Sequence, residues 1–80
     1  MLICNDVISK IEQQLSGELS ATALASWAFS RLYAYELGEE EFSAALIEAV
    51  LDDLTFADDA AFALDAEALH MLINRLQQQV

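Results

Sequence analysis

Apolar residues recur along this chain at the three- and four-residue spacing of amphipathic helices. The first such run comprises Val7, Ile8, Ile11 and Leu15. It predicts a helix over residues 6–16. Strands are disfavoured, because alanine is abundant, β-branched residues are few and no stretch alternates strictly between apolar and polar positions.

The residues that border the apolar runs are typical of helix ends. Asn5 or Asp6 can cap the first helix and Ser20 the second, because a short polar side chain accepts a hydrogen bond from the first turn. Gly17 and Gly38 each follow an apolar run, where a helix end commonly needs a residue with positive φ. We therefore expect Gly17 to stop the first helix and Ser20 to begin the second.

Two further helices are expected in the second half of the chain. The third begins near Glu39–Glu41, whose carboxylates suit the positive end of a helix dipole. Residues 55–64 predict an irregular connection or a short helical turn, and Asp65 caps the last helix. Four antiparallel helices with short connections would form one all-α bundle over residues 1–80.

The apolar stripes of the expected helices define a candidate core. Trp27, the sole tryptophan, is expected at its centre. Cys4 is expected as a small buried side chain, and as the only cysteine it cannot form a disulfide within the chain. The expected core residues are Ile8, Ile11, Leu15, Leu24, Trp27, Leu46, Val50, Leu69, Leu72 and Leu76.

Composition adds a strong asymmetry of charge to this pattern. The 80 residues include 14 Asp and Glu against three Lys and Arg, for a formal net charge of −11, yet 56% are hydrophobic. Such a chain can bury a core, so it is not a disordered acidic tail. Eleven of the acids and none of the basic residues lie within residues 36–67. This balance disfavours nucleic acid as a ligand and favours a basic partner.

Several of these acids share one side of the third expected helix. Glu41, Glu48 and Asp52 are spaced by seven and four residues, opposite the apolar stripe. Glu48 and Asp52 form a like-charged pair that costs roughly 0.2–0.5 kcal/mol in an isolated helix. A positive partner would relieve this repulsion; acidity that serves only solubility is the alternative. The candidate partner-binding residues are Glu41, Glu48, Asp52, Asp53, Asp58, Asp59, Tyr33 and Phe56.

Motifs for catalysis, cofactors and metals do not emerge from the sequence. The lone His70 is expected at the surface, without the partners of a nucleophilic triad. The acids that follow Asp53 lack the alternating ligands, the glycine and the final glutamate of an EF-hand loop. Two glycines 21 positions apart cannot form a phosphate-binding loop. We therefore expect a protein that is not an enzyme and uses no cofactor or metal.

The length of the apolar runs and the sequence of the first residues predict where the protein is located. No run approaches the 18 or more residues that cross a bilayer, and residues 1–6 contain no basic segment of a signal peptide. With a single cysteine as well, the chain is expected to be cytoplasmic and to make no contact with a membrane.

Two short motifs carry a resemblance to a known family. Residues 15–20, Leu-Ser-Gly-Glu-Leu-Ser, and residues 25–28, Ala-Ser-Trp-Ala, resemble a small all-helical group of bacterial immunity proteins. These belong to contact-dependent growth inhibition and related polymorphic toxin systems. In that group, these motifs are followed by an acidic stretch and then by a Leu-Asp element that opens the last helix. Residues 62–65 and Leu69 resemble this Leu-Asp element. The last helix departs from the group, because residues 70–76 lack its acidic and aromatic character.

The resemblance implies inhibition of one cognate toxin in the cytoplasm of the producing cell. Such toxins are commonly nucleases, whose active sites are basic because they handle phosphates. Two other functions are compatible with the same acidic surface. One is a nucleic-acid mimic that inhibits a host or defence enzyme, and the other is a helical docking module whose charge serves solubility. The sequence leaves the oligomeric state open.

Overall fold

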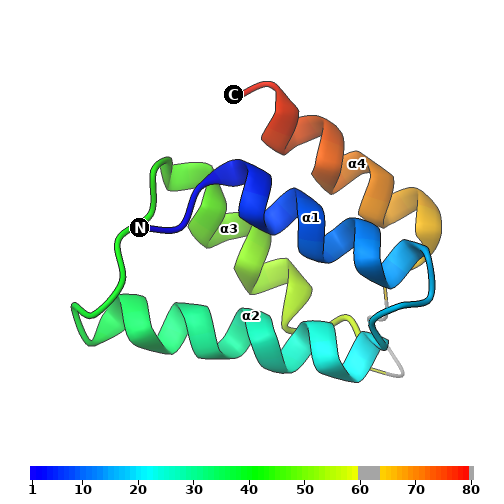
Figure 1. Ribbon diagram of the computed structural model, residues 1–80, viewed down its shortest axis with the longest axis horizontal. Helices are drawn as coiled ribbons and strands as arrows, with labels where there is room; N and C mark the ends of the chain where they lie inside the picture. The colour runs from blue at the N-terminus through cyan, green and yellow to red at the C-terminus, as the bar shows by residue number, and fades with distance from the viewer. Residues whose placement is uncertain (60–63, 80) are drawn as a thin grey trace.

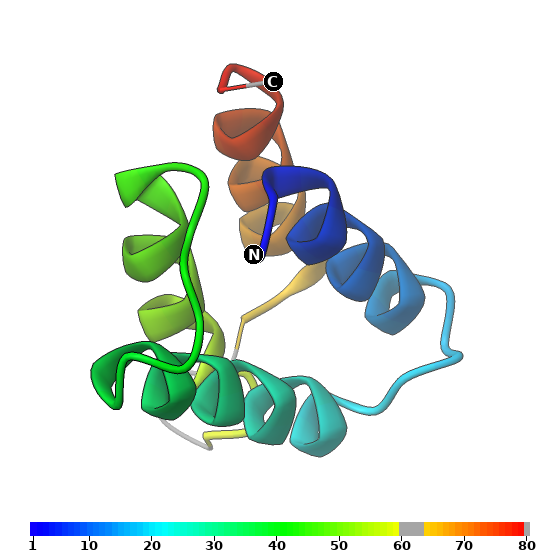
Figure 2. The same ribbon diagram turned by 60° about the vertical axis from the view of Figure 1, so that its left-hand side comes forward.

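Four helices form the structure, a computed structural model that describes residues 1–59 and 64–79 (Figure 1). They are α1 (Cys4–Leu15), α2 (Ala21–Glu36), α3 (Ala45–Leu54) and α4 (Ala66–Gln77). Helix α2 packs mainly against α3 and α1 mainly against α4, and the two pairs enclose the core between them (Figure 2). The predicted all-α bundle of four helices is confirmed.

Ser20 and Asp65 cap α2 and α4 as predicted. The Ser20 hydroxyl oxygen accepts a hydrogen bond from the backbone N–H of Ala23 at 3.1 Å. The Asp65 carboxylate accepts one from the N–H of Ala68 at 2.8 Å. Each bond satisfies a backbone donor that the helix itself leaves unpaired, so both helices begin where this local chemistry places them.

The two glycines follow α1 and α2 with the predicted positive φ angles, 88° at Gly17 and 77° at Gly38. After α2, the N–H of Gly38 donates to the Tyr35 carbonyl at 3.1 Å, and the N–H of Glu39 donates to the Ala34 carbonyl at 2.9 Å. This is the Schellman pattern, which satisfies the last carbonyls of a helix and turns the chain away from its axis.

The predicted start of α1 is wrong by two residues. Ile3 occupies the N-cap position, and not Asn5 or Asp6 as predicted. Asp6 instead lies inside the first turn, and its carboxylate accepts a hydrogen bond from the N–H of Ile3 at 3.1 Å. A carboxylate in this place still satisfies a free donor and still faces the positive end of the helix dipole.

The predicted start of α3 near Glu39–Glu41 is also wrong, because residues 41–43 are extended and pair with the N-terminal segment. The N–H of Leu2 donates to the Glu41 carbonyl at 2.8 Å, and the N–H of Ser43 donates to the Leu2 carbonyl at 3.0 Å. These bonds take the backbone groups that a helix would need, so α3 begins only at Ala45.

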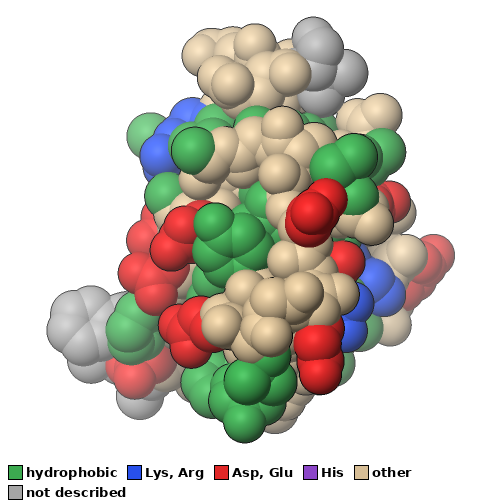
Figure 3. Space-filling view, turned by 90° about the vertical axis from the view of Figure 1, so that its left-hand side faces the viewer, with side chains coloured by type: hydrophobic (Ala, Val, Ile, Leu, Met, Phe, Trp, Pro, Cys, Tyr) green, Lys and Arg blue, Asp and Glu red, His purple; other side chains and the backbone are tan. Residues whose placement is uncertain are grey.

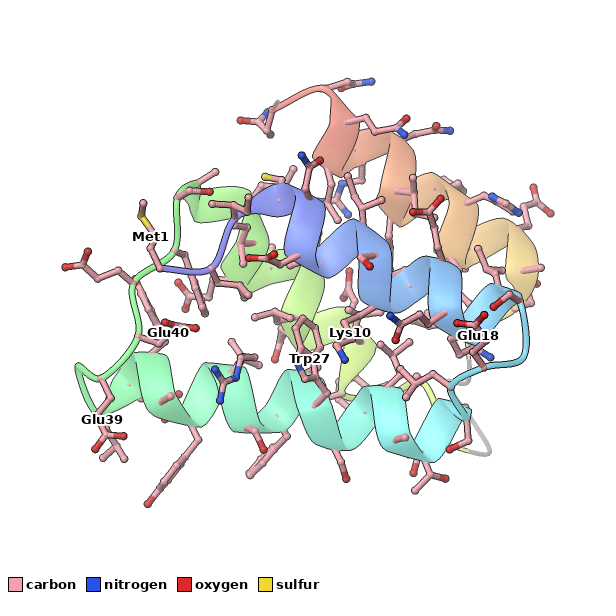
Figure 4. The ribbon with its side chains drawn as sticks, viewed as in Figure 1. Met1, Lys10, Glu18, Trp27, Glu39 and Glu40 are labelled. Carbon is pink, nitrogen blue, oxygen red and sulfur yellow. The ribbon has the colours of Figure 1, made fainter. Side chains whose placement is uncertain are left out.

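Side chains hold the same segment in place. The rings of Tyr35 and Phe42 are stacked, with centroids 4.2 Å apart. Glu40 accepts a hydrogen bond from the guanidinium of Arg31 at 3.3 Å, and its carboxylate lies 3.8 Å from the amino nitrogen of Met1 (Figure 4). The chain between α2 and α3 is therefore fastened both to α2 and to the N-terminus.

The core contains no buried polar or charged side chain among the described residues. Seven expected core residues are buried: Ile8, Ile11, Leu24, Val50, Leu69, Leu72 and Leu76. Cys4 is buried, as predicted. Leu15 and Leu46 pack against the core but are only partly buried, because they lie in the last turn of α1 and the first turn of α3.

The prediction that Trp27 is the centre of the core is wrong. Its ring is partly buried at the edge between α1 and α2, with the Lys10 ammonium 5.8 Å from the ring centroid (Figure 4). The buried positions of α2 are instead Leu24, Ala25 and Ala28. Small residues on this face let the helix approach its neighbours closely, which leaves a large ring room only at the margin.

Candidate functional site

The outward sides of α2 and α3 form a groove. Two adjoining hollows of about 380 and 190 Å³ share Leu32, Glu36 and Asp52 as lining residues, so they form one continuous depression. The larger hollow extends along α3 and the smaller one along α2 to the end of α3. We call this surface the α2–α3 groove; it comprises Phe29, Leu32, Tyr33, Glu36, Ala45, Glu48, Ala49, Asp52 and Thr55.

Helix α2 contributes one wall because its apolar surface extends beyond its buried positions. Phe29, Leu32, Tyr33 and Glu36 lie at positions i, i+3, i+4 and i+7 of the helix, which places them on one face. This face adjoins the buried positions of α2: Leu32 is partly buried against the core, whereas Phe29 and Tyr33 are exposed. The apolar surface of α2 is therefore wider than the part that the domain covers, and Phe29 and Tyr33 form its uncovered margin.

Helix α3 contributes the other wall in a simpler way. Its buried residues are Ile47, Val50, Leu51 and Leu54. The exposed positions that face the groove carry alternately small and acidic side chains: Ala45, Glu48, Ala49 and Asp52. The two alanines leave space beside the carboxylates, which is why this part of the surface is hollow.

Two large aromatic side chains are unusually exposed in the groove. Phe29 is 64% exposed and Tyr33 57% exposed, although each carries a ring that a single domain normally covers. They are four residues apart on one helix and so lie next to each other. Adjacent exposed aromatic residues are typical of surfaces that bind another protein.

The groove is negatively charged along its length. Glu36, Glu48 and Asp52 line it, and no Lys or Arg does. The basic side chains of the chain are engaged elsewhere: Lys10 beside Trp27, Arg31 with Glu40, and Arg75 with its guanidinium 3.9 Å from the Asp53 carboxylate. Within the part of the chain that the structure describes, the three groove carboxylates therefore have no basic neighbour.

Of the predicted partner-binding residues, the structure brings Tyr33, Glu48 and Asp52 together in the groove. Asp53 is the next residue to Asp52 but faces α4, where Arg75 lies. Glu41 is not on the face of α3 that the heptad-like spacing predicted, because it precedes the helix in the extended segment.

The remaining predicted residues follow α3 in a turn. Phe56 and Asp58 are exposed there, and the N–H of Asp59 donates to the Phe56 carbonyl at 3.0 Å. These residues adjoin the groove in sequence through Thr55 but do not line it. The connection at residues 55–59 is a turn, and the rest of the predicted segment extends into residues 60–63, outside the described part of the chain.

Phe29, Leu32 and Glu36 line the groove but are not among the predicted partner-binding residues. Their signal was present in the i, i+3, i+4, i+7 spacing that also includes Tyr33. That pattern extends the apolar surface of α2 beyond its buried positions, but the pairing of this surface with α3 depends on tertiary structure.

Other surfaces of the molecule differ from the groove in character. A hollow of about 530 Å³ between α1 and α4 is lined by the exposed His70 and mainly by other polar residues, without a Phe, Tyr or Trp side chain. The face that carries the N-terminus and the start of α3 shows acidic side chains interspersed with hydrophobic ones (Figure 3). Acidity thus extends beyond the groove, whereas the combination of a hollow, exposed rings and unpaired carboxylates occurs in the groove.

Among the described residues, no group of three His, Cys, Asp or Glu side chains lies close enough together to hold a metal ion. None of the described helices combines the length and the apolar character needed to cross a membrane.

Comparisons of this chain with models of protein families, with curated proteins and with solved structures found no match. The groove is therefore the feature of this chain that indicates a function. Its chemistry consists of carboxylate oxygens that accept hydrogen bonds and of exposed ring faces, both arranged on rigid helices.

Proposed function

We propose that this protein binds a basic protein toxin through the α2–α3 groove and neutralises it, as the immunity proteins that its sequence resembles do. The observation that supports this function best is the presence of Phe29 and Tyr33, both exposed, beside three carboxylates that lack a basic neighbour. A nuclease domain is the class of toxin proposed, because a surface that binds phosphates is itself basic.

The two kinds of side chain in the groove would serve different steps of binding. Carboxylates on a chain of net charge −11 attract a basic partner at long range and can raise association to ~10⁸–10⁹ M⁻¹s⁻¹ at low salt. Rings that become buried supply the anchoring contacts that slow dissociation. Fast capture suits an inhibitor that must act as soon as a toxin is present.

The exposed rings also favour this function over mimicry of nucleic acid. A mimic presents its charges to a channel that binds phosphates, and it needs no apolar anchor between them. Phe29 and Tyr33 interrupt the acidic surface with two rings. They would be left without a role in a purely electrostatic mimic, whereas a protein partner would cover them.

Co-expression tests the proposed function directly. The C-terminal domain of the protein encoded beside this chain should arrest growth when it is expressed alone and be harmless when this chain is expressed with it. Toxicity that persists in the presence of this chain, or a neighbouring product without toxicity, would exclude an immunity role.

The location of the contact surface is tested with matched charge variants. The triple variant Glu36→Gln, Glu48→Gln, Asp52→Asn changes the net charge from −11 to −8 in the groove. A control at the exposed residues Glu12, Glu18 and Glu67, each changed to Gln, makes the same change elsewhere. We expect the groove variant to lose protection and to associate more slowly, and the control to retain both. Equal slowing of the two would assign the effect to net charge alone.

A further inference from the structure

We infer that the α2–α3 groove is selective for arginine over lysine in the segment of the basic partner that it binds. This inference rests on the proposed function, in that it names which basic side chain the groove recognises. It is carried by the juxtaposition of carboxylates from two helices with exposed aromatic rings around one hollow.

The carboxylates are placed to receive a donor that reaches both walls. Glu36 belongs to α2 and Asp52 to α3, and both line the stretch that the two hollows share. A guanidinium presents five N–H donors in one plane, so a single arginine can donate to oxygens on both walls. A lysine ammonium is a compact charge that offers no such planar fork.

The rings and the apolar lining add a second reason for preferring arginine. Phe29 and Tyr33 expose their rings beside the acids, and Leu32 lies in both hollows. Guanidinium groups stack on aromatic faces and are less strongly hydrated than ammonium groups. Moving arginine into a partly apolar groove therefore costs less solvation and gains a stacking contact.

Charge complementarity excludes a second copy of this chain as the occupant. Face-to-face association of two such grooves would bring six carboxylates together with no basic side chain from either groove. Repulsion of this kind disfavours self-association, whereas an arginine-bearing segment neutralises the same carboxylates.

The test compares two labelled peptides of equal charge, nine arginines and nine lysines, by fluorescence anisotropy with the full chain at physiological ionic strength. Both peptides are attracted equally by the net charge, so the ratio of their Kd values removes that common contribution, and the variants below locate the remaining preference. We expect the arginine peptide to bind about tenfold more tightly, an effect of the size that one or two cation–π contacts produce. Amide shifts in NMR spectra should concentrate on α2 and α3.

Variants of exposed residues make the test specific. Tyr33→Leu and Phe29→Leu keep an apolar side chain but remove a ring, and both should reduce the arginine preference several-fold with little change for the lysine peptide. Glu18→Gln, which removes a carboxylate between α1 and α2 (Figure 4), should leave the preference unchanged. Equal affinities for the two peptides, a preference that persists without the rings, or amide shifts on α1 and α4 would overturn the inference.

The two proposals can fail separately. A chain that protects cells from its neighbouring toxin yet binds both peptides equally would contradict the arginine selectivity only. A chain that prefers the arginine peptide yet protects against no neighbouring product would contradict the immunity role and support the chemistry of the groove.

Discussion

Asp65 determines where α4 begins through one hydrogen bond to the N–H of Ala68. Asp65→Ala removes the acceptor and leaves that donor without a side-chain partner, which costs about 1 kcal/mol. For a domain of this size we expect the midpoint of thermal unfolding to fall by roughly 4–8 °C. Circular dichroism during a temperature ramp measures the change.

Asp65→Asn is the matched control, because its amide oxygen can accept the same hydrogen bond. It should keep most of the stability that Asp65→Ala loses. If the two variants lose equal stability, the negative charge at the helix dipole, and not the hydrogen bond, is what Asp65 contributes.

The residues that end helices were predictable because their chemistry is local. Ser20 and Asp65 bond to backbone groups three residues away, and the positive φ of Gly17 and Gly38 is a property of those positions themselves. The burial of Trp27 was not predictable in the same way. How deeply a ring lies depends on how closely two helices approach, and no local pattern records that distance.

At the scale of elements, the pairing of the N-terminal segment with residues 41–43 decides where α3 can start. Leu2 is only 6% exposed, so its side chain helps to hold the pairing. Leu2→Ala should destabilise the domain by about 2 kcal/mol. It should also speed hydrogen exchange at the amide of Ser43, which donates to the Leu2 carbonyl.

Ile3→Ala is the control for this change, because Ile3 is adjacent in sequence but 42% exposed. Its effect on the exchange of the Ser43 amide should be small. Unchanged exchange in Leu2→Ala, despite lower stability, would show that the backbone pairing does not depend on burial of the Leu2 side chain.

Helix α3 can be stabilised by a substitution at its N-terminus. Its N-cap is Ala44, which has the extended backbone of a capping residue but provides no side-chain hydrogen bond. Ala44→Ser should add about 1 kcal/mol and raise the unfolding midpoint by roughly 4–8 °C. Ala45→Ser, one position further, lies inside the helix and should bring a slight loss. A loss in both variants would show that the site at residue 44 cannot accommodate a hydroxyl group.

The elements themselves were largely predictable from periodicity, whereas their contacts were not. Taken alone, the acids at Glu39–Glu41 favour the start of a helix, but hydrogen bonds to Leu2 prevent it. Because Leu2 lies about 40 positions away in sequence, no local window of sequence includes this pairing. The same holds for the groove. Tyr33, Glu48 and Asp52 were identifiable as candidates, yet only the packing of α2 on α3 brings them together with Glu36.

At the scale of the whole molecule, the net charge of −11 has two opposite effects. Repulsion among the acids destabilises the folded protein, whereas the same charge attracts a basic partner. The Debye length is about 30 Å at 0.01 M salt and about 10 Å at 0.1 M. The molecule measures 30 × 25 × 21 Å, so at the lower salt concentration every acid repels every other across the domain. At the higher concentration only near neighbours still interact.

Salt should therefore stabilise the free protein while it slows capture of a basic partner. Between these two salt concentrations we expect a gain of about 0.5 kcal/mol in the free energy of unfolding, or roughly 2–4 °C in the midpoint. Over the same range, association with a basic partner should slow by about tenfold, because steering is screened. Thermal unfolding and stopped-flow association in matched buffers measure the two effects.

The groove variant Glu36→Gln, Glu48→Gln, Asp52→Asn separates local charge from total charge in this experiment. Its stability should rise with salt much as that of the control variant at Glu12, Glu18 and Glu67 does, since both have a net charge of −8. Its association rate should depend on salt more weakly than that of the control, because the carboxylates nearest the partner are gone. Identical salt dependence in the two variants would mean that the partner approaches another part of the acidic surface.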